Sequence, residues 1–169
     1  MKTLVKISVF VLLAITVATC LFQPSREEQQ LLGNWGEEKD DAILCLQLNP
    51  NHQANFYFFY SNLFTGEFLM KVKMNWELID GKLSLRFDKK DPPEIAINSA
   101  LKNTAMRMKI NEMQDGLLKD LEKDFAIERF YEITEEGDLV IGEGEERQVI
   151  PAYSQANVDL LEDFLKEHK

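Results

Sequence analysis

The residues of this sequence that could do chemistry are two histidines, two cysteines and many carboxylates. We expect His52 and His168 to be exposed, since neither has a cysteine or carboxylate at the spacing of metal ligands. Acidic pairs such as Glu135-Glu136 are typical of solvated turns, and the run EEGD lacks the register of a calcium loop. No serine-nucleophile, phosphate-loop or zinc motif occurs. The sequence therefore predicts a protein that is not an enzyme and that uses no metal and no cofactor.

Cys45 belongs to the run AILCLQL, whose composition is typical of a β-strand. We expect its thiol to be buried and unreactive, because apolar surroundings disfavour the thiolate. The only other cysteine is Cys20, in the N-terminal segment. If Cys20 is modified there, Cys45 has no partner, and the fold must be held together by packing and not by a disulfide.

The first 22 residues have the features of a secretory leader. Lys2 and Lys6 precede an apolar run of 16 residues, from 7 to 22. This run is shorter than the roughly 20 residues that a membrane-spanning helix needs. We therefore expect export and removal of the leader in preference to a retained membrane anchor.

Two kinds of processing compete at the end of this leader. The residues VATC, which end at Cys20, resemble the lipobox of bacterial lipoproteins, in which the cysteine is acylated and becomes the new N-terminus. Ordinary cleavage after Ala18 or after Cys20 would instead release a soluble secreted protein. We favour the lipoprotein, because the polar stretch that follows is typical of a tether. The prediction is a signal peptide over 1–19, a lipid-anchored tether over 20–30 and one domain over 31–169, held at an envelope membrane by its lipid.

The mature chain is acidic, and the acid is concentrated in one part of it. Without residues 1–19 the chain has 17 basic and 29 acidic residues, a net charge of −12. Thirteen acidic and three basic residues lie between Glu112 and Glu146. Nucleic acid is excluded as a partner, because phosphate binding needs clustered lysine and arginine. The same stretch could instead attract a basic protein.

Between 68 and 87 the sequence alternates apolar and polar residues on either side of Asp80-Gly81. This dipeptide is typical of a two-residue β-hairpin turn, because both residues tolerate positive φ. Period two predicts a solvent-facing side made of Lys71, Lys73, Asn75 and Glu77. The other side is apolar and consists of Phe68, Met70, Val72, Met74, Trp76 and Leu78. A strand this long with large apolar residues at every second position predicts a strongly curved sheet or a barrel wall.

Further strand-like runs and three helical segments complete the pattern. Apolar strand signals lie at 42–48, 55–60, 126–133, 138–143 and 147–153. Capping-box spacing of Ser25 and Glu28 predicts a short first helix. Apolar residues at three- and four-residue steps predict one or two helices near 95–125, and an amphipathic helix ends the chain. We expect a mostly β protein, an antiparallel β-barrel with a helical insertion near 95–125 and a C-terminal helix.

The order of four motifs resembles the lipocalin-like, calycin-type lipoproteins of bacterial envelopes. These motifs are Leu32-Gly33-Asn34-Trp35 before the first strand, FYFFY, the hairpin WELIDGKLSL and a late I-x-x-x-G-D-L-V-I, and they cover residues 31 to about 152. The resemblance implies a lipocalin-like barrel closed at one end by Trp35, with Arg147 as the residue that covers it. It also implies an interior that holds a ligand.

Three functional hypotheses follow, in addition to a purely structural role in the envelope. The first is a binding protein that holds a small apolar ligand against the side that runs from Phe68 to Leu78. The second is an acidic module that docks on, or inhibits, a basic protein such as a cationic hydrolase. The third is an enzyme with paired carboxylates, which would require two converging acids. We favour the first, because barrels commonly house ligands and the sequence offers few catalytic residues.

Overall fold

The computed structural model describes residues 24–62, 66–87, 91–98, 104–125 and 128–169. Cys20 and the predicted signal peptide over 1–19 lie outside these residues. The described helices are α2 (Arg26–Leu31), α3 (Thr104–Phe125) and α4 (Gln155–His168), with a 3₁₀ turn at Gly144–Glu146. The strands are β1 (Gly33–Lys39), β2 (Ala42–Leu48), β3 (Gln53–Asn62), β4 (Gly66–Ile79), β5 (Lys82–Phe87), β6 (Glu94–Asn98), β7 (Arg129–Ile133), β8 (Leu139–Ile141) and β9 (Gln148–Ile150).

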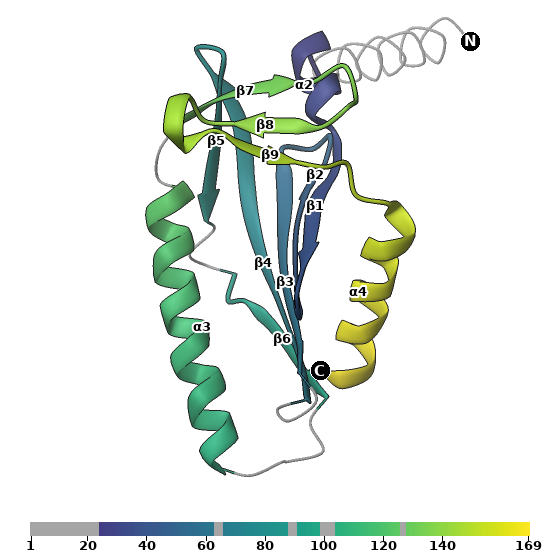
Figure 1. The fold of residues 1–169 in the computed structure, drawn as a ribbon, viewed down its shortest axis with the longest axis vertical. Coiled ribbons are helices and arrows are strands. Elements are labelled where there is room, and N and C mark those ends of the chain that lie inside the picture. Colours follow the sequence, from purple (N-terminus) through teal and green to yellow (C-terminus); the bar gives the residue numbers. More distant parts are fainter. Residues whose placement is uncertain (1–23, 63–65, 88–90, 99–103, 126–127) are drawn as a thin grey trace, which may run out of the picture.

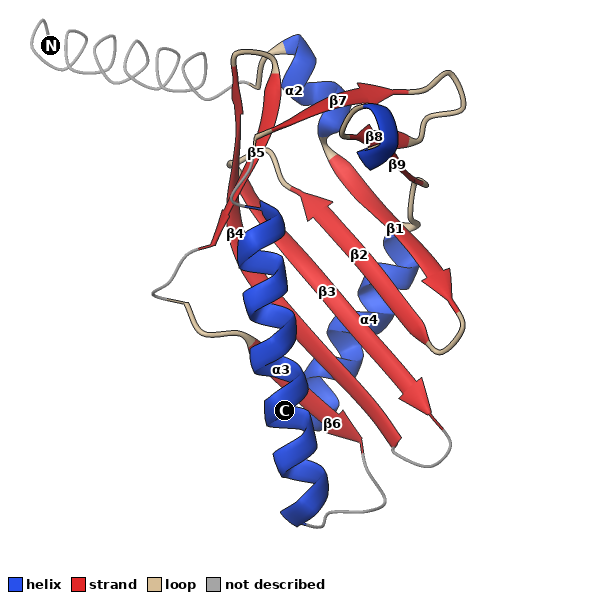
Figure 2. Cartoon of the chain, turned by 60° about the vertical axis from the view of Figure 1, so that its left-hand side comes forward, coloured by secondary structure: helices blue, strands red, loops and turns tan. Residues whose placement is uncertain are grey.

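The strands form one antiparallel sheet that almost closes into a barrel (Figures 1 and 2). The order is β1-β2-β3-β4-β5-β7-β8-β9, and the chain after β9 returns to β1. There the Gly36 N–H donates to the Pro151 carbonyl at 2.9 Å, and the Tyr153 N–H donates to the Asn34 carbonyl at 2.8 Å. The prediction of a mostly β, lipocalin-like antiparallel barrel with helical additions is confirmed.

β4 determines the shape of this barrel. One edge of its 14 residues pairs with β3, and the other edge pairs first with β6 and then with β5. Where β4 pairs with β5, the sheet continues through β7, β8 and β9 and almost closes. Where β4 pairs with β6, the sheet ends at β6 and remains open (Figure 2). The turn to β5 has φ values of 51° at Asp80 and 74° at Gly81, as the predicted hairpin requires.

Helices lie over both faces of the sheet, but of the predicted solvent-facing residues only Lys71 is covered, whereas Lys73, Asn75 and Glu77 are exposed or half-exposed. α3 lies over one face and α4 over the other (Figures 1 and 2). Val158, Leu161 and Leu165 of α4 pack on Cys45, Tyr57 and Leu69, among other residues of the sheet. The side chain of Lys71 is only 12% exposed beneath this helix. Period two could not predict the cover, because the helix that supplies it lies about 90 residues further along the chain.

The two terminal helices agree with the sequence. In α2 the Glu28 N–H donates to Ser25 Oγ at 3.1 Å and the Ser25 N–H donates to Glu28 Oε2 at 2.6 Å, which is the predicted capping box. Leu31 at the end of α2 is fully buried, so this helix, most of which falls in the predicted tether, packs onto the barrel. Ser154 caps α4, which buries its predicted apolar side.

The region 95–125 is only partly helical. Residues 94–98 form β6, opposite 67–71 of β4, and α3 begins at Thr104. Ile95 and Ile97 face the main core from this strand, and Ala96 faces α4. The side chains of these three residues alternate between the two faces, as in a strand. The sequence analysis instead assigned Ile95 and Ile97 to the helical pattern of the residues that follow them. Gly116 does not interrupt α3.

Gly36 allows the barrel edges to meet. A Cβ atom built there would lie 2.6 Å from the Leu44 carbonyl oxygen and 3.2 Å from Tyr153 Cγ. We expect Gly36→Ala to lower the free energy of unfolding by about 1–3 kcal/mol, because the Leu44 backbone is fixed in the sheet and cannot move away from the added methyl group. Urea denaturation followed by circular dichroism measures this change. Gly116→Ala is the matched control, since open space surrounds that helical glycine and alanine should stabilise it by about 0.5–1 kcal/mol. An unchanged midpoint for Gly36→Ala would contradict the tight closure.

Candidate functional site

The predicted ligand-binding side of β4 lies in the main core. Five of its six residues are at most 4% exposed, and Leu78 is half-buried. They pack with buried side chains from neighbouring strands and with Leu121 of α3, while Leu117 and Phe125 of the same helix pack against this core. A ligand on this side would have to enter between the sheet and α3. The five fully buried residues are Phe68, Met70, Val72, Met74 and Trp76.

Trp35 and Arg147 lie in different surroundings. Trp35 is 6% exposed, and its indole Nε1–H donates to the Leu31 carbonyl at 3.0 Å, which joins α2 to β1. Arg147 is half-exposed after the 3₁₀ turn, and its Nη2 lies 3.5 Å from Glu132 Oε2 on β7. The hydrogen bond of Trp35 and the ion pair of Arg147 thus involve different partners.

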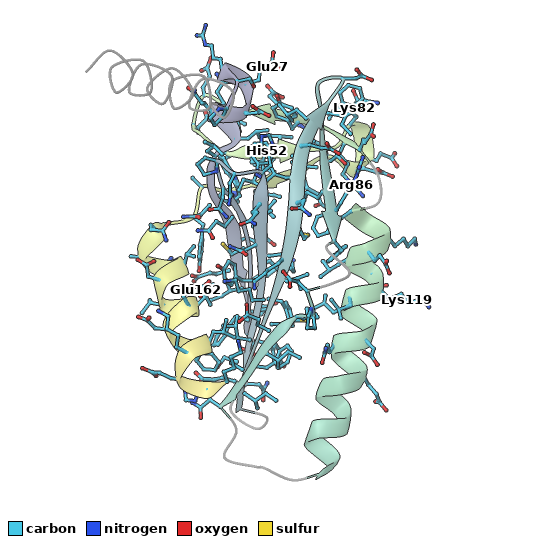
Figure 3. All side chains as sticks on the ribbon, turned by 180° about the vertical axis from the view of Figure 1, so that it is seen from behind. Glu27, His52, Lys82, Arg86, Lys119 and Glu162 are labelled. Atoms are coloured by element: carbon cyan, nitrogen blue, oxygen red, sulfur yellow. The ribbon has the colours of Figure 1, made fainter. Side chains whose placement is uncertain are left out.

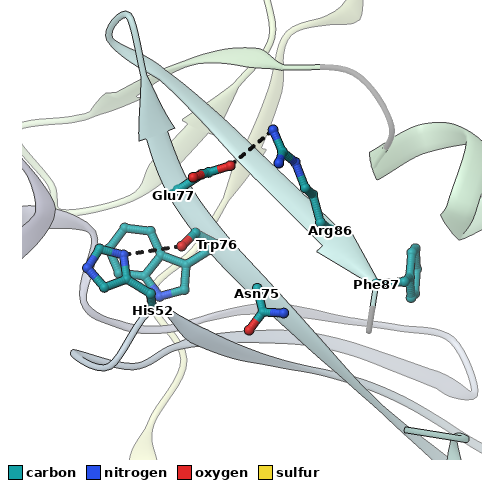
Figure 4. A pocket seen from close by; sticks show the side chains of 6 residues that line it. All are labelled: His52, Asn75, Trp76, Glu77, Arg86 and Phe87. Carbon is teal, nitrogen blue, oxygen red and sulfur yellow. Dashed lines mark hydrogen bonds and ion pairs between the residues drawn. The ribbon is translucent and has the colours of Figure 1, made fainter. Parts of the chain in front are cut away.

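A pocket, the outer pocket, opens where β4 leaves β3 and continues with β5 (Figure 4). Asn75 and Arg86 reach it from the outward side of the strands, whereas Phe87 lies on the side that Met74 shares. Its volume is about 450 Å³, and it is open to solvent. The register places Asn75 directly opposite Arg86, and Met74 directly opposite Phe87. The residues that line it are His52, Asn75, Trp76, Glu77, Arg86 and Phe87.

The turn before β3 brings His52 to this pocket. His52 has a φ of 60°, and its carbonyl accepts the Trp76 N–H at 2.8 Å. Its imidazole stacks on the Trp76 indole with centroids 5.2 Å apart, and its Nδ1 lies 3.3 Å from the Trp76 carbonyl oxygen. The His52 side chain is 51% exposed, and its Nε2 lies 3.8 Å from Glu28 Oε1. One face of the pocket is therefore an aromatic stack with an accessible outer ring.

Polar side chains supply the rest of the pocket. Arg86 Nη2 lies 3.0 Å from Glu77 Oε1, and both side chains are about half-exposed. Asn75 is exposed beside them. The Trp76 indole beneath is held by a hydrogen bond from Nε1 to the Asn49 carbonyl at 2.9 Å. The site offers donors, acceptors and rings on a rigid strand pair, which suits binding.

The sequence pattern missed this pocket although it contained a signal for it. Asn75 and Glu77 were assigned to the outward side of β4, and the Asp80-Gly81 turn fixes their partner strand. Counting across that turn places Arg86 opposite Asn75. The position of His52 could not be derived in this way, because it depends on how the turn before β3 folds over β4.

A second polar cluster lies between α4 and the sheet. Glu162 Oε1 accepts a hydrogen bond from the Tyr57 hydroxyl at 2.6 Å and lies 2.5 Å from Lys71 Nζ. Glu162 extends from α4 towards the strands (Figure 3). Burial opposes its ionisation, but the hydrogen bonds from Lys71 and Tyr57 outweigh this and lower the pKa of Glu162. Burial, together with the bond to Glu162, raises the pKa of Tyr57. This cluster fixes α4 on the sheet.

Cys45 lies in the same layer and is a buried free thiol. Burial raises its pKa to about 12, so the thiol stays protonated at neutral pH. The prediction of a buried cysteine is confirmed, and the raised pKa agrees with a thiol of low reactivity. Neither this thiol nor the Tyr57–Glu162 pair lines the outer pocket.

Two further findings concern the described part of the chain alone. It contains no group of three or more histidine, cysteine, aspartate or glutamate side chains placed to hold a metal ion. Its helices are also too short or too polar to span a bilayer. Comparisons of the chain with protein-family models, with curated proteins and with solved structures find no match.

Proposed function

We propose that this protein is a lipocalin-like binding protein without catalytic activity, and that it holds a small ligand in the outer pocket. The pocket itself carries the proposal, because it combines about 450 Å³ of accessible space with converging polar groups and an aromatic stack. The sequence pattern favoured an apolar ligand against the side from Phe68 to Leu78. We move the ligand to the outer pocket because that side is packed against α3.

The proposal also includes the localisation of the protein. Cys20 is acylated and tethers the domain to an envelope membrane, on the side away from the cytoplasm, as the VATC motif indicates. Metabolic labelling with a radioactive fatty acid should mark the wild-type chain and leave Cys20→Ser unlabelled. A Cys20→Ser variant that keeps the label, or a soluble wild-type protein cleaved after Ala18, would contradict acylation at Cys20.

Two reporters distinguish the outer pocket from the interior. The His52 imidazole lines the pocket, whereas the methyl groups of Met70 and Met74 lie in the main core. Nuclear magnetic resonance of the full chain in nanodiscs should follow both during titration with maltotriose, acetate, arginine and indole. We expect at least one polar probe to shift the His52 signals in a saturable way and to leave both methionines unchanged. If indole alone binds and shifts the methionine methyls, the interior is the ligand site and this proposal fails.

A second function is favoured by the exposed acid of α3 and the strands that follow. We propose that this surface docks on a basic protein. Its exposed carboxylates are Glu112, Asp115, Asp120, Glu122, Glu128, Glu132, Glu135, Glu136, Glu143, Glu145 and Glu146.

Salt dependence tests the docking proposal. A cationic lysozyme should bind the full chain less tightly as salt rises, because exposed charges are screened beyond about 8 Å at physiological ionic strength. Reversal of Glu135 and Glu136 to lysine should weaken that binding. Reversal of the exposed Glu37 on β1 is the control and should not. Absence of binding at low salt, or equal effects of the two reversals, would exclude this surface.

A further inference from the structure

We infer that the outer pocket takes a neutral, polyhydroxylated ligand, and specifically a saccharide ring. This inference rests on the proposed binding function and adds the class of ligand. Its basis is the arrangement of the lining side chains, with His52 and Phe87 at opposite ends and the polar residues Asn75, Glu77 and Arg86 between them (Figure 4).

The polar centre of the pocket matches adjacent hydroxyl groups. Glu77 presents a carboxylate that only accepts hydrogen bonds, and Arg86 presents a guanidinium that only donates them. Asn75 does both and lies directly opposite Arg86 across the strand pair. Each sugar hydroxyl is at once a donor and an acceptor. Neighbouring hydroxyls can therefore bridge a carboxylate and a guanidinium that lie side by side.

The charge of this centre favours a neutral ligand over an ion. Glu77 and Arg86 already form an ion pair at 3.0 Å, so their charges compensate each other. An anion would compete with Glu77 for the guanidinium, and a cation would compete with Arg86 for the carboxylate. A polyol can bond to the outer atoms of both groups and leave the pair intact, and His52 has its own neighbouring carboxylate in Glu28.

The rings at the two ends suit the apolar faces of a sugar. The His52 imidazole is half-exposed and backed by Trp76, so its outer face is available for packing. Phe87 is half-buried at the end of β5, opposite Met74, and closes the other end of the pocket from the side that faces α3, where its ring lies 6.0 Å from that of Phe125. Both rings are fixed by their own contacts, which lowers the entropy that binding would cost. Carbon-bound hydrogens on a sugar ring can pack on such surfaces while the hydroxyls reach the polar centre.

Titration with two neutral trisaccharides tests the inference. Maltotriose and chitotriose are added separately to the full chain in nanodiscs, while acetate and arginine represent anions and amines. We expect at least one trisaccharide to shift the His52 signals in a saturable way, and Glu77→Gln, Arg86→Ala and Asn75→Ala each to weaken its binding at least tenfold. Lys166→Ala is the matched control, since Lys166 is also the cation of an exposed ion pair, at 2.9 Å from Asp163 on α4. Its affinity for the trisaccharide should equal that of the wild type.

The outcomes separate the ligand class from the binding function. Binding of acetate at His52 that is lost in Arg86→Ala, or binding of arginine that is lost in Glu77→Gln, without binding of either trisaccharide, would overturn the saccharide class and leave the pocket as a binding site. No response of His52 to any of the four probes would overturn both. Equal weakening of trisaccharide binding by Lys166→Ala and Arg86→Ala would place the sugar elsewhere and also overturn the inference. The pocket variants are at exposed or half-exposed positions, and an unchanged thermal midpoint shows that each is folded.

Discussion

Replacement of Trp76 by alanine should lower the free energy of unfolding by about 3–5 kcal/mol, as is typical of a large aromatic side chain removed from a core. The side chain is 1% exposed and belongs to the main core. Its loss leaves a cavity below the pocket and also leaves the Asn49 carbonyl without the indole donor. Urea denaturation of the variant and the wild type measures the difference.

Two variants separate the parts of this effect. Trp76→Phe keeps most of the packing but removes the bond to Asn49, and we expect it to cost about 1–2 kcal/mol. Glu77→Ala, the next residue on the outward side, should cost at most about 1 kcal/mol, since its ion pair with Arg86 is half-exposed. If Glu77→Ala were as harmful as Trp76→Ala, the assignment of the two sides of β4 would be wrong.

Replacement of Lys71 by methionine should lower the free energy of unfolding by about 2–4 kcal/mol, because it leaves the Glu162 carboxylate under α4 without its cation. The sequence pattern alone predicts a change within about 0.5 kcal/mol, as for a lysine in solvent. Lys73→Ala is the control: that lysine is 46% exposed, pairs with Glu94 at 3.2 Å and should cost at most about 1 kcal/mol. A Lys71→Met, Glu162→Leu double variant should recover much of the loss, because no buried charge remains unpaired.

The contribution of this pair should depend on pH in a defined direction. The pKa of Glu162 is lowered in the folded protein from its ordinary value of 4.5. Its ionisation therefore stabilises the fold fully above pH 4.5, and this stabilisation is lost as the pH falls through the lowered folded pKa. The difference in stability between the wild type and Glu162→Gln should be constant at neutral pH and shrink in acid. A difference that grows in acid would contradict the lowered pKa.

The parts of the fold that were predicted correctly depend on short-range rules. The Ser25–Glu28 box and the Asp80-Gly81 turn each involve residues within a few positions, and the structure has both. The side of β4 from Phe68 to Trp76 follows from period two along one strand. Such features need no knowledge of the rest of the chain.

The parts that were missed depend on partners far away in the sequence. Lys71 is shielded from solvent because α4 packs over it, and its partner on α4, Glu162, lies 91 positions further along the chain. Residues 94–98 are a strand because β4 offers them a free edge beside β5. The pocket needs His52 to fold over Trp76, and no local pattern encodes that contact. Tertiary contacts of this kind override local periodicity.

The way the barrel closes has a consequence for the order of folding. From β1 to β5 each strand pairs with the next one along the chain, so this meander can form through contacts between residues close in sequence. The hydrogen bonds that join the first strand to the last segment span far more chain, for example 121 positions between Asn34 and Gln155 and 115 between Glu38 and Tyr153. Closing so large a loop costs conformational entropy, which is lost before the contacts of the seam can compensate for it. We therefore expect the meander to form first and the seam between β1 and the segment after β9 to close last.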